Sequence, residues 1–414
     1  MRRALLRMGR RDARASALAA AGIWAVHPLL SEAVMGVVQR DEILASLFLL
    51  LTLLELDRGR LRLSFVACLL GVASKEIAVA APLLALLYDR AFLAGSFRRA
   101  WRERRRYYLA LASTWMPLGV LMATSRHRDN TVGFGLGVSP WSYLLTEARA
   151  IAHYLRLGAW PRPLVIDYGT ELAPNLGAVW PEGLLVLALL GLTAWALVRR
   201  PALGFLGAAF FAVLAPSSSF VPLVTQPVAE HRMYLPLASL IVLLIAGAGS
   251  WAGKRLLPAW AAAAALLALA TAGRVGDYRA ELPLWEGALA ASPRNDRAWL
   301  NLGTLWSHRG RGDQAIACYR QALALDPGQA DTHFDLAAEL DRAGLLGEAI
   351  PEYREAERLD PERPNAPYYL GLALARSGRL ADAVAPLERA AALRPGSAAA
   401  GRALAEVRAA LGRP

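Results

Sequence analysis

The chain has 414 residues, of which 56% are hydrophobic, and its mean hydropathy is +0.32. A soluble domain with a solvated surface is less apolar, so the composition predicts a protein that lies in a lipid bilayer. Lys and Arg outnumber Asp and Glu by 46 to 34, but the basic residues stand in short runs beside apolar segments. Runs so placed orient membrane spans, and no nucleic-acid partner is expected.

Apolar segments recur through residues 1–275. Crossing ~30 Å of hydrocarbon takes about 20 apolar residues, and shorter segments count when neighbours cover their ends. We predict an all-α, polytopic bundle with about nine spans. They lie near residues 15–37, 42–56, 63–73, 77–92, 107–123, 183–198, 202–215, 234–249 and 256–272.

The first apolar stretch could instead be a secretory signal peptide. It is too long for one, contains Pro28 and Glu32, and lacks a small-residue cleavage site before a soluble domain. It is therefore interpreted as a span.

Basic runs mark one side of these spans, at residues 2–14, 58–62, 98–106, 199–200 and 254–255. Because basic residues are retained on the cytoplasmic side, the N-terminus is expected in the cytoplasm. An odd number of spans then places the C-terminal region on the opposite face.

Ionisable residues gather in four segments on that opposite, outward face. They are the hairpin with His27, Glu32, Arg40, Asp41 and Glu42, the turn with Lys75 and Glu76, the loop with Asp167 and Tyr168, and residues 216–236 with Glu230, His231 and Arg232. Such residues cost a few kcal/mol each at membrane depth and so mark function. Carboxylates could act as a base or bind a metal, and cations could hold phosphate, which fits glycosyl transfer from a polyprenyl phosphate.

A structural explanation competes with this functional one at each position. Asp41 and Glu42 would also be favourable as acids in the first turn of a helix. His231 and Arg232 would also serve as interfacial anchors. The gathering of all four segments on one face favours function.

A further apolar stretch, residues 141–160, is predicted to lie in the membrane interface. At about 100° per residue, Leu144, Ile151 and Leu155 share one helix face while Arg149 and Arg156 share the other. If this helix crossed the bilayer, every later basic run would move to the outer side.

The C-terminal part carries the most specific pattern. Pro293, Pro327, Pro361 and Pro395 stand 34 residues apart, which is the period of tetratricopeptide (TPR) repeats. We predict a connecting half-repeat helix in residues 276–294 and a TPR α-solenoid in residues 295–414. Its repeats are 296–329, 330–363 and 364–397, and a capping helix follows at 398–411. The array predicts protein contact, although its aromatic residues are assigned to packing and no binding residue is assigned.

Four segments carry a family resemblance. They are HPLLSEAVMGVVQRDEILASLFL from His27, SKE from Ser74, YLLTEARAIAHYLRLGAWPRPL ahead of Asp167, and APSSSFVPLVTQPVAEHRMYLPL from Ala215. Together with the in-phase repeats, they resemble the transmembrane and tetratricopeptide-repeat O-mannosyltransferase family (TMTC) and its bacterial relatives. The resemblance covers nearly the whole chain.

The resemblance implies a GT-C-type membrane glycosyltransferase fold. It also implies a polyprenyl- or dolichyl-phosphate-linked sugar, mannose or another hexose, and an acceptor hydroxyl on protein or an envelope glycan. Family members carry an outward loop with an acidic pair upstream of the segment that matches His27. Only 26 residues precede His27 here, so an N-terminal truncation is expected and the catalytic first loop is missing from the chain.

Site roles follow from the resemblance. Asp41, Glu42 and Glu32 are the expected catalytic acids. Arg40, His231 and Arg232 are expected at the donor phosphate, because arginine offers a forked pair of donors. Further candidates are Glu230, Lys75, Glu76 and Asp167. No cofactor is assigned, and the carboxylates leave a divalent cation open.

Two functions remain open. The chain is either a glycosyltransferase whose repeats bind the acceptor, or a membrane-anchored scaffold that assembles envelope proteins. A transporter is disfavoured because no paired broken helices are evident in corresponding halves. Abundant Ala, Arg, Leu and Gly indicates a GC-rich bacterium, so the expected place is the inner membrane, with periplasmic repeats.

Overall fold

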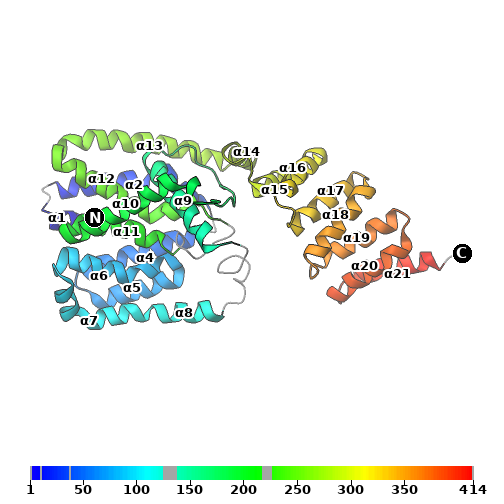
Figure 1. Cartoon of the computed structure of the whole chain (residues 1–414), viewed down its shortest axis with the longest axis horizontal. Coiled ribbons are helices and arrows are strands. Elements are labelled where there is room, and N and C mark those ends of the chain that lie inside the picture. Colours follow the sequence, from blue (N-terminus) through cyan, green and yellow to red (C-terminus); the bar gives the residue numbers. More distant parts are fainter. Residues whose placement is uncertain (1, 10–11, 37–38, 125–137, 217–225, 413–414) are drawn as a thin grey trace. The chain divides into compact units, whose positions relative to one another are not determined.

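The computed structural model describes residues 2–9, 12–36, 39–124, 138–216 and 226–412, and in these ranges it is built of helices without strands (Figure 1). Two compact units are present. The first comprises Met1–Ile166 and Thr170–Arg279, and the second comprises Asp167–Gly169 and Ala280–Pro414. The predicted all-α class is confirmed.

The first unit is a bundle of helices that run back and forth (Figure 1). Its α-helices are α1 (Arg2–Arg7), α2 (Ala13–Ala25), α3 (Ser31–Met35), α4 (Arg40–Asp57), α5 (Leu61–Ser74), α6 (Ala81–Tyr88), α7 (Phe97–Ser113), α8 (Trp115–Thr124), α9 (Pro140–Ala159), α10 (Trp180–Arg199), α11 (Pro201–Leu214), α12 (Tyr234–Ala252) and α13 (Leu257–Asp277). Shorter turns are η1 (Pro28–Leu30), η3 (Glu76–Ala80), η4 (Asp89–Leu93), η6 (Leu176–Ala178), η7 (Glu230–Met233) and η8 (Gly253–Leu256).

Fewer helices are long enough to span a bilayer than the sequence predicted. Among the described residues, Trp180–Arg199, Glu230–Ala248 and Leu257–Asp277 are long and apolar enough, and Ala13–Ala25 with Pro28–Met35 is a fourth if that pair, bent by 55°, is one span. Leu61–Ser74 and Pro201–Leu214 are apolar but shorter. Of the nine expected spans, among which short ones were counted, three or four therefore have the length and apolar composition of a full span in the described residues, because breaks and charged ends shorten the others.

The predicted segment 107–123 shows why. It is divided between α7 and α8, and Thr114 stands at the break, where its hydroxyl donates to the Leu111 carbonyl at 2.6 Å. In α7 the backbone also kinks at Arg104 (φ −132°, ψ 22°). Hydropathy averaged over a window does not detect such breaks.

Close helix packing holds the core of the first unit. Leu49, Leu84 and Leu111 are buried there among α4, α6 and α7. At Gly71 in α5, a Cβ would meet Phe48 Cβ at 3.2 Å and Ala78 Cβ at 3.1 Å, so α5 approaches α4 and η3 through this glycine. Interiors packed to this density tolerate little added volume.

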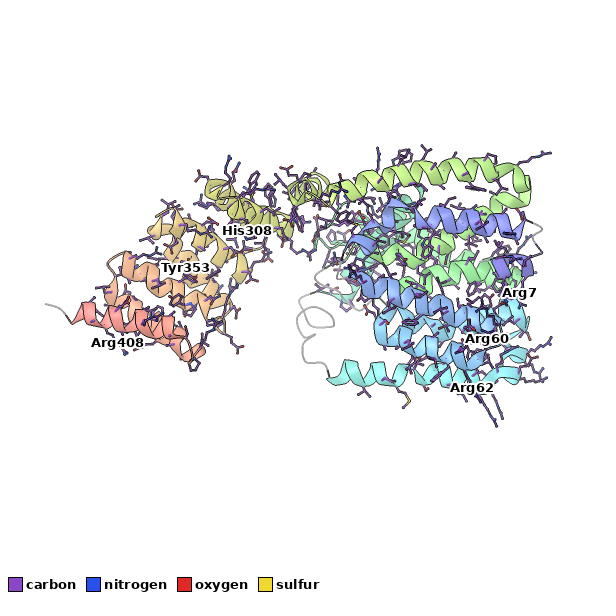
Figure 2. All side chains as sticks on the ribbon, turned by 180° about the vertical axis from the view of Figure 1, so that it is seen from behind. Arg7, Arg60, Arg62, His308, Tyr353 and Arg408 are labelled. Carbon is purple, nitrogen blue, oxygen red and sulfur yellow. The ribbon has the colours of Figure 1, made fainter. Side chains whose placement is uncertain are left out.

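One end of this bundle is rich in arginine. Asp57, at the end of α4, accepts hydrogen bonds from Arg3 Nη1 at 2.8 Å and Arg7 Nε at 2.9 Å. Asp89 binds Arg104 Nη1 at 2.8 Å. Figure 2 places Arg7, Arg60 and Arg62 at this same end. The basic side predicted from the sequence therefore gathers around buried carboxylates.

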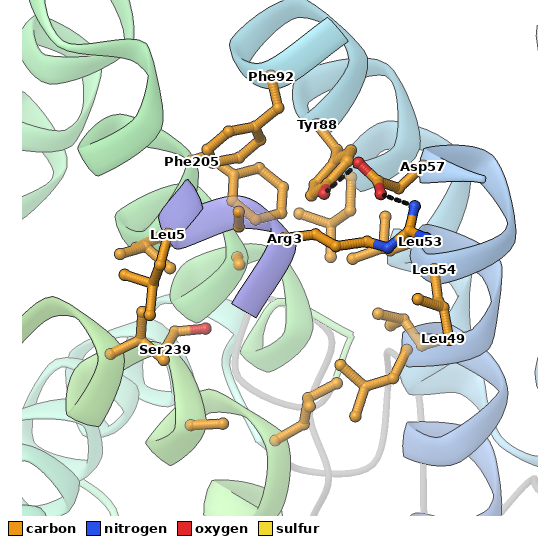
Figure 3. A pocket seen from close by; sticks show the side chains of 18 of the residues that line it. Arg3, Leu5, Leu49, Leu53, Leu54, Asp57, Tyr88, Phe92, Phe205 and Ser239 are labelled. Carbon is orange, nitrogen blue, oxygen red and sulfur yellow. Dashed lines mark hydrogen bonds and ion pairs between the residues drawn. The ribbon is translucent and has the colours of Figure 1, made fainter. Parts of the chain in front are cut away.

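An apolar cavity of about 370 Å³ lies beside Asp57 (Figure 3). Leu49 and Leu53 of α4, Phe205 of α11 and Ser239 of α12 line it, and Arg3 reaches across one side to Asp57. Asp57 and Asp41 are 16 residues apart on α4, which is about 24 Å of helix. This cavity is therefore at the opposite end of α4 from the predicted catalytic acids.

The segment predicted to lie in the membrane interface forms the helix α9, one face of which packs into the first unit. Leu144 is 42% exposed, whereas Tyr154 and Thr146 are buried. Both bury polar groups that have partners: Tyr154 Oη accepts from the Ala229 N–H at 2.9 Å, and Thr146 Oγ1 accepts from the Ala173 N–H at 2.8 Å. These two buried polar side chains of α9 are therefore hydrogen-bonded, while Leu144 stays exposed on the first unit.

The second unit is a stack of helix pairs. They are α14 (Glu281–Ala291), α15 (Asp296–His308), α16 (Gly312–Leu325), α17 (Ala330–Arg342), α18 (Leu346–Leu359), α19 (Asn365–Arg376), α20 (Leu380–Leu393) and α21 (Ala398–Leu411). Gly310, Gly344 and Gly378 turn the chain within each pair at φ of 70°, 78° and 80°, a backbone region that glycine adopts freely. At Gly371, a Cβ would meet Leu387 Cγ at 2.5 Å, so glycine permits the close approach of α19 and α20.

Candidate active site

Three helix breaks meet at one end of the first unit. Pro28 interrupts the path from α2 to α3, Lys75 interrupts α5 and η3 with extended backbone (φ −161°, ψ 152°), and Ala229 precedes η7 with extended backbone (φ −150°, ψ 131°). The turns η1 and η7 pack together, as do α3 and η7, and α4 and η3. Non-helical backbone at membrane depth is tolerated where it is buried in protein or lines a cavity.

His27 stabilises the first break. Its Nδ1 accepts from the Leu29 N–H at 3.2 Å, so its Nε2 carries the proton that is donated to the Gly158 carbonyl at 3.2 Å. Trp24 also binds across the bundle, donating from Nε1 to the Tyr234 carbonyl at 2.7 Å. The break is thus fixed by side-chain hydrogen bonds.

Glu32 and His231 form a buried pair across this junction. Glu32 Oε1 lies 2.8 Å from His231 Nδ1, and Glu32 Oε2 accepts from the His231 backbone N–H at 2.9 Å. Each residue is 7% exposed. The carboxylate thereby fixes both the position and the ring orientation of the histidine, which leaves Nε2 as the nitrogen that can meet a substrate.

Lys75 forms a second charged group with two acids of α4. Its Nζ lies 3.0 Å from Glu42 Oε2 and 3.2 Å from Asp41 Oδ1. Although burial lowers the pKa of Lys75, the adjacent carboxylates of Glu42 and Asp41 outweigh burial and raise it. Lys75 is therefore a fixed cation between an almost fully buried acid and a half-exposed one.

The two groups belong to one electrostatic cluster. His231 and Glu76 both act on the charge of Glu42, together with Lys75. The structure therefore brings together Glu32, Asp41, Glu42, Lys75, Glu76 and His231, all of which the sequence proposed as site residues. We call these six residues the junction cluster.

Arg232 and Glu230 have structural partners. Arg232 Nη1 donates to the Pro227 carbonyl at 2.7 Å and Nη2 donates to the Gln226 carbonyl, and the residue is 6% exposed. Glu230 Oε1 accepts from the Val165 N–H at 2.7 Å. In this arrangement both residues hold the backbone around η7, and Arg232 does not present its guanidinium to solvent.

The remaining candidates separate. Arg40 is exposed at the start of α4, and among the described residues it makes no hydrogen bond or ion pair. Asp167 belongs to the second unit, where it binds Arg297 Nη2 at 2.8 Å and Asn295 Nδ2 at 3.2 Å. Residues 217–225, which belong to the predicted site segment 216–236, lie outside the described residues.

Two site-supporting residues of α9 had no role in the sequence interpretation. Glu147 lies 3.6 Å from Arg232, and Tyr154 accepts from the Ala229 N–H just before η7. Tyr143, Glu147, Ala150 and Tyr154 recur at helical spacing and are all buried. The spacing of these residues could have predicted that this face of α9 is buried. Arg149 and Arg156 nearby suggested instead that it is solvated.

In the part of the chain that the structure describes, no group of three or more His, Cys, Asp or Glu side chains has the geometry to hold a metal. Asp41 and Glu42 bind Lys75 instead. Chemically, the junction cluster combines an oriented imidazole with carboxylates and a fixed ammonium, which are groups suited to proton transfer beside an anion.

Known proteins resemble both parts of the chain. Tetratricopeptide repeat family models match residues 296–329 and 334–398, which confirms the predicted repeats. Protein O-mannosyl-transferase TMTC4 of Mus musculus is 28% identical over 372 residues, covering 74% of this chain and 49% of that protein. Protein O-mannosyl-transferase Tmtc1 of Drosophila melanogaster is 24% identical over 434 residues, covering 78% of this chain and 50% of that protein.

The resemblance to the TMTC family is thereby confirmed. The matched region extends beyond the repeats, because it covers about three quarters of the chain. The chain spans about half the length of these curated relatives.

Proposed function

We propose that the chain is a membrane glycosyltransferase that moves a hexose from a polyprenyl phosphate to a hydroxyl of a protein or envelope glycan. The buried Glu32–His231 pair carries the proposal, because burying it is costly without a function and it leaves one imidazole nitrogen oriented. The similarity to named protein O-mannosyl-transferases supports the same reaction class.

The reaction requires one proton transfer and one anionic leaving group. The acceptor oxygen forms a bond to the anomeric carbon while the bond from that carbon to the phosphate oxygen breaks. The acceptor proton passes to a carboxylate, for which half-exposed Asp41 is the assigned group. The polyprenyl phosphate leaves with the bonding electrons.

Cations of the junction cluster and its rim would stabilise that leaving phosphate. Lys75 supplies a fixed charge, exposed Arg40 offers a forked pair of donors, and His231 would donate from Nε2 when its ring carries two protons. We assign Glu32 to positioning His231, and Arg232 and Glu230 to holding the η7 backbone. Glu42 would hold the ammonium of Lys75 in place, and Glu76 adds negative charge near Glu42.

The repeats are proposed to bind the protein that receives the sugar. They would lie on the periplasmic side of a bacterial inner membrane, with the arginine-rich end of the first unit in the cytoplasm. The spans named above support a membrane location for the first unit. Asp167, which binds the start of the first repeat, would belong to the repeat unit and not to the reacting centre.

The donor class tests this proposal. The purified chain in lipid nanodiscs is given a labelled hexose either on a polyprenyl phosphate or on a nucleotide, together with envelope proteins as acceptors. Label should pass to acceptor only from the polyprenyl phosphate. Transfer from the nucleotide alone would overturn the donor assignment, and no transfer from either would favour the alternative function, a membrane-anchored scaffold.

A further inference from the structure

The second unit contains a groove of about 820 Å³ that α17, α18, α19 and α21 line. Phe334, Asp335, Tyr353, Tyr369, Arg376 and Glu406 are among its lining residues. Tyr353 marks its place in Figure 2. The groove has an aromatic part and a charged part, and the two parts together indicate what it binds.

The aromatic part is a fixed cluster. The ring centroid of Phe334 lies 5.7 Å from that of Tyr353 and 5.6 Å from that of Tyr369, and the rings of Tyr353 and Tyr369 stack at 6.1 Å. Tyr353 is 1% exposed and Tyr369 is 40% exposed. Tyr369 therefore presents an aromatic surface that Phe334 and the buried Tyr353 hold in place.

The charged part is acidic in effect. The arginines that line the groove already have partners: Arg342 Nη1 lies 2.7 Å from Glu339 Oε1, and Arg376 pairs with Asp341. Among the described residues, the lining acids Asp335 and Glu406 form no ion pair. The groove therefore offers two carboxylates that form no ion pair with the described residues.

The titration of Asp335 agrees with this geometry. Burial, with Glu339 adding to it, raises the pKa of Asp335 to about 6, while Arg342 and His308 act in the opposite direction. A carboxylate whose charge is destabilised in this way gains most from an incoming cation.

We propose that this groove binds an extended, cationic peptide segment, with a Lys or Arg side chain over Tyr369 and its charge on Asp335. A cation over a tyrosine face and an ion pair with a half-buried carboxylate both favour that occupant. An acidic peptide would meet Asp335 and Glu406, while the arginines beside them are already neutralised. This inference deepens the acceptor-binding part of the proposed function, on which it rests.

Binding is measured on the full chain in nanodiscs at pH 7.5 without any sugar donor. Three fluorescein-labelled, otherwise identical flexible 15-residue peptides carry Lys, Gln or Glu at the variable positions, and anisotropy gives their affinities. The Lys peptide should bind about tenfold more tightly than the Gln peptide, and the Glu peptide should bind least. Because the whole chain carries a net charge of +12, non-specific attraction would give the opposite order.

Two variants locate the binding in the groove. Asp335→Asn removes one charge without changing the shape, and Tyr369→Leu removes the ring but keeps an apolar side chain at an exposed position. Each should reduce the affinity for the Lys peptide about fivefold to tenfold. The matched control Glu362→Gln removes a carboxylate from an exposed turn outside the groove and should change nothing.

Equal affinity for the Lys and Gln peptides, or unchanged affinity in both groove variants, would overturn the inference. The outcome is separate from that of the transfer assay. Lys-peptide binding without sugar transfer would leave the inference standing and contradict the enzyme proposal. Sugar transfer without a preference for the Lys peptide would support the enzyme proposal and contradict the inference about the groove.

Discussion

At the scale of single residues, the candidate site is built from partners that are far apart in sequence. Glu32 binds His231, which is 199 positions away, and Lys75 binds Asp41 at 34 positions. The sequence identified these residues as candidates because ionisable groups are costly at membrane depth. It did not pair them, because which turns meet depends on helix packing.

Arginine at the site was the least predictable residue. Arg232 was expected at a donor phosphate, but its guanidinium donates to the carbonyls of Pro227 and Gln226. Both carbonyls stand a few residues before η7, and only the folded path of that segment makes them available. The sequence shows that a hydrogen-bond donor is present. It does not show whether backbone carbonyls of the folded chain will accept that donor's hydrogen bonds.

Removing the ammonium of Lys75 should destabilise the first unit. Lys75→Met leaves Glu42, whose side chain is 1% exposed, as a buried charge without its cation, which costs about 3–5 kcal/mol. A thermal melt of tryptophan fluorescence in detergent should show a clearly lower midpoint. The double variant Lys75→Met with Glu42→Gln should recover much of the loss, whereas an additive loss would show that the pair is not coupled.

Asp335 should make the repeats more stable at lower pH. Its folded pKa of about 6 lies above the usual value of 3.8, so the folded state binds the proton more readily than the unfolded state. Its contribution is therefore unfavourable above about pH 6 and fades as the pH falls towards 4. Asp335→Asn should melt at a higher temperature than the native chain at pH 7.5, and this difference should shrink at pH 5.

Other ionisable groups lie around Asp335, so the experiment needs a control for their effect on the melting temperature. Glu339 and Arg342 of α17 and His308 of α15 act on it directly, and Tyr319 of α16 interacts with its charge. Because His308 acts on the charge of Asp335, the comparison with Asp335→Asn is repeated with His308→Gln in both chains. A difference that did not change with pH would contradict the assignment to Asp335.

At the scale of elements, the repeats were predictable and the helix breaks were not. The 34-residue period predicted every helix pair of the array, because glycine and proline recur where the turns need them. In the first unit, by contrast, Pro28 ends one helix and begins a turn, while the prolines at the start of α10 and α11 merely begin helices. The same residue type has different effects, and tertiary packing decides between them.

Glycine at the closest approach of a helix pair provides a sharp test of this packing. In Gly371→Val the new Cβ would meet Leu387 Cγ at 2.5 Å and the Ala383 carbonyl oxygen at 3.3 Å. We expect a loss of about 1–3 kcal/mol in the free energy of unfolding, measured by urea denaturation followed by circular dichroism.

Gly347→Ala is the matched control, because a Cβ at that position in α18 has nothing within 4 Å. Alanine favours helix over glycine by up to about 1 kcal/mol, so this variant should be as stable as the native chain or more stable. Equal losses in the two variants would show that the close approach at Gly371 does not matter.

At the scale of the whole molecule, composition and charge predicted an apolar helical part followed by a repeat array, and both are present. Three or four of the about nine expected spans have the length of a full span among the described residues, because breaks shorten the other helices. Those same helix breaks bring the residues of the junction cluster together. The breaks therefore both shorten the helices and build the candidate site.

The expected membrane orientation is testable with cysteine labelling. Cys68 and Cys318 are both buried and would be replaced by Ala. Exposed positions are then labelled one at a time with a membrane-impermeant maleimide on spheroplasts: Arg62→Cys at the arginine-rich end and Asp313→Cys in the repeats. Asp313→Cys should react before lysis and Arg62→Cys only after it, and the reverse order would overturn the orientation.

The central claim, that the Glu32–His231 pair serves glycosyl transfer, is tested most directly by the transfer rate of Glu32→Gln. Glutamine keeps the size of the side chain but removes the carboxylate that orients His231, so transfer from the polyprenyl-linked hexose should fall about 100-fold or more. Glu286→Gln, at an exposed position of α14, should keep the native rate. A native transfer rate in a folded Glu32→Gln chain would contradict the account.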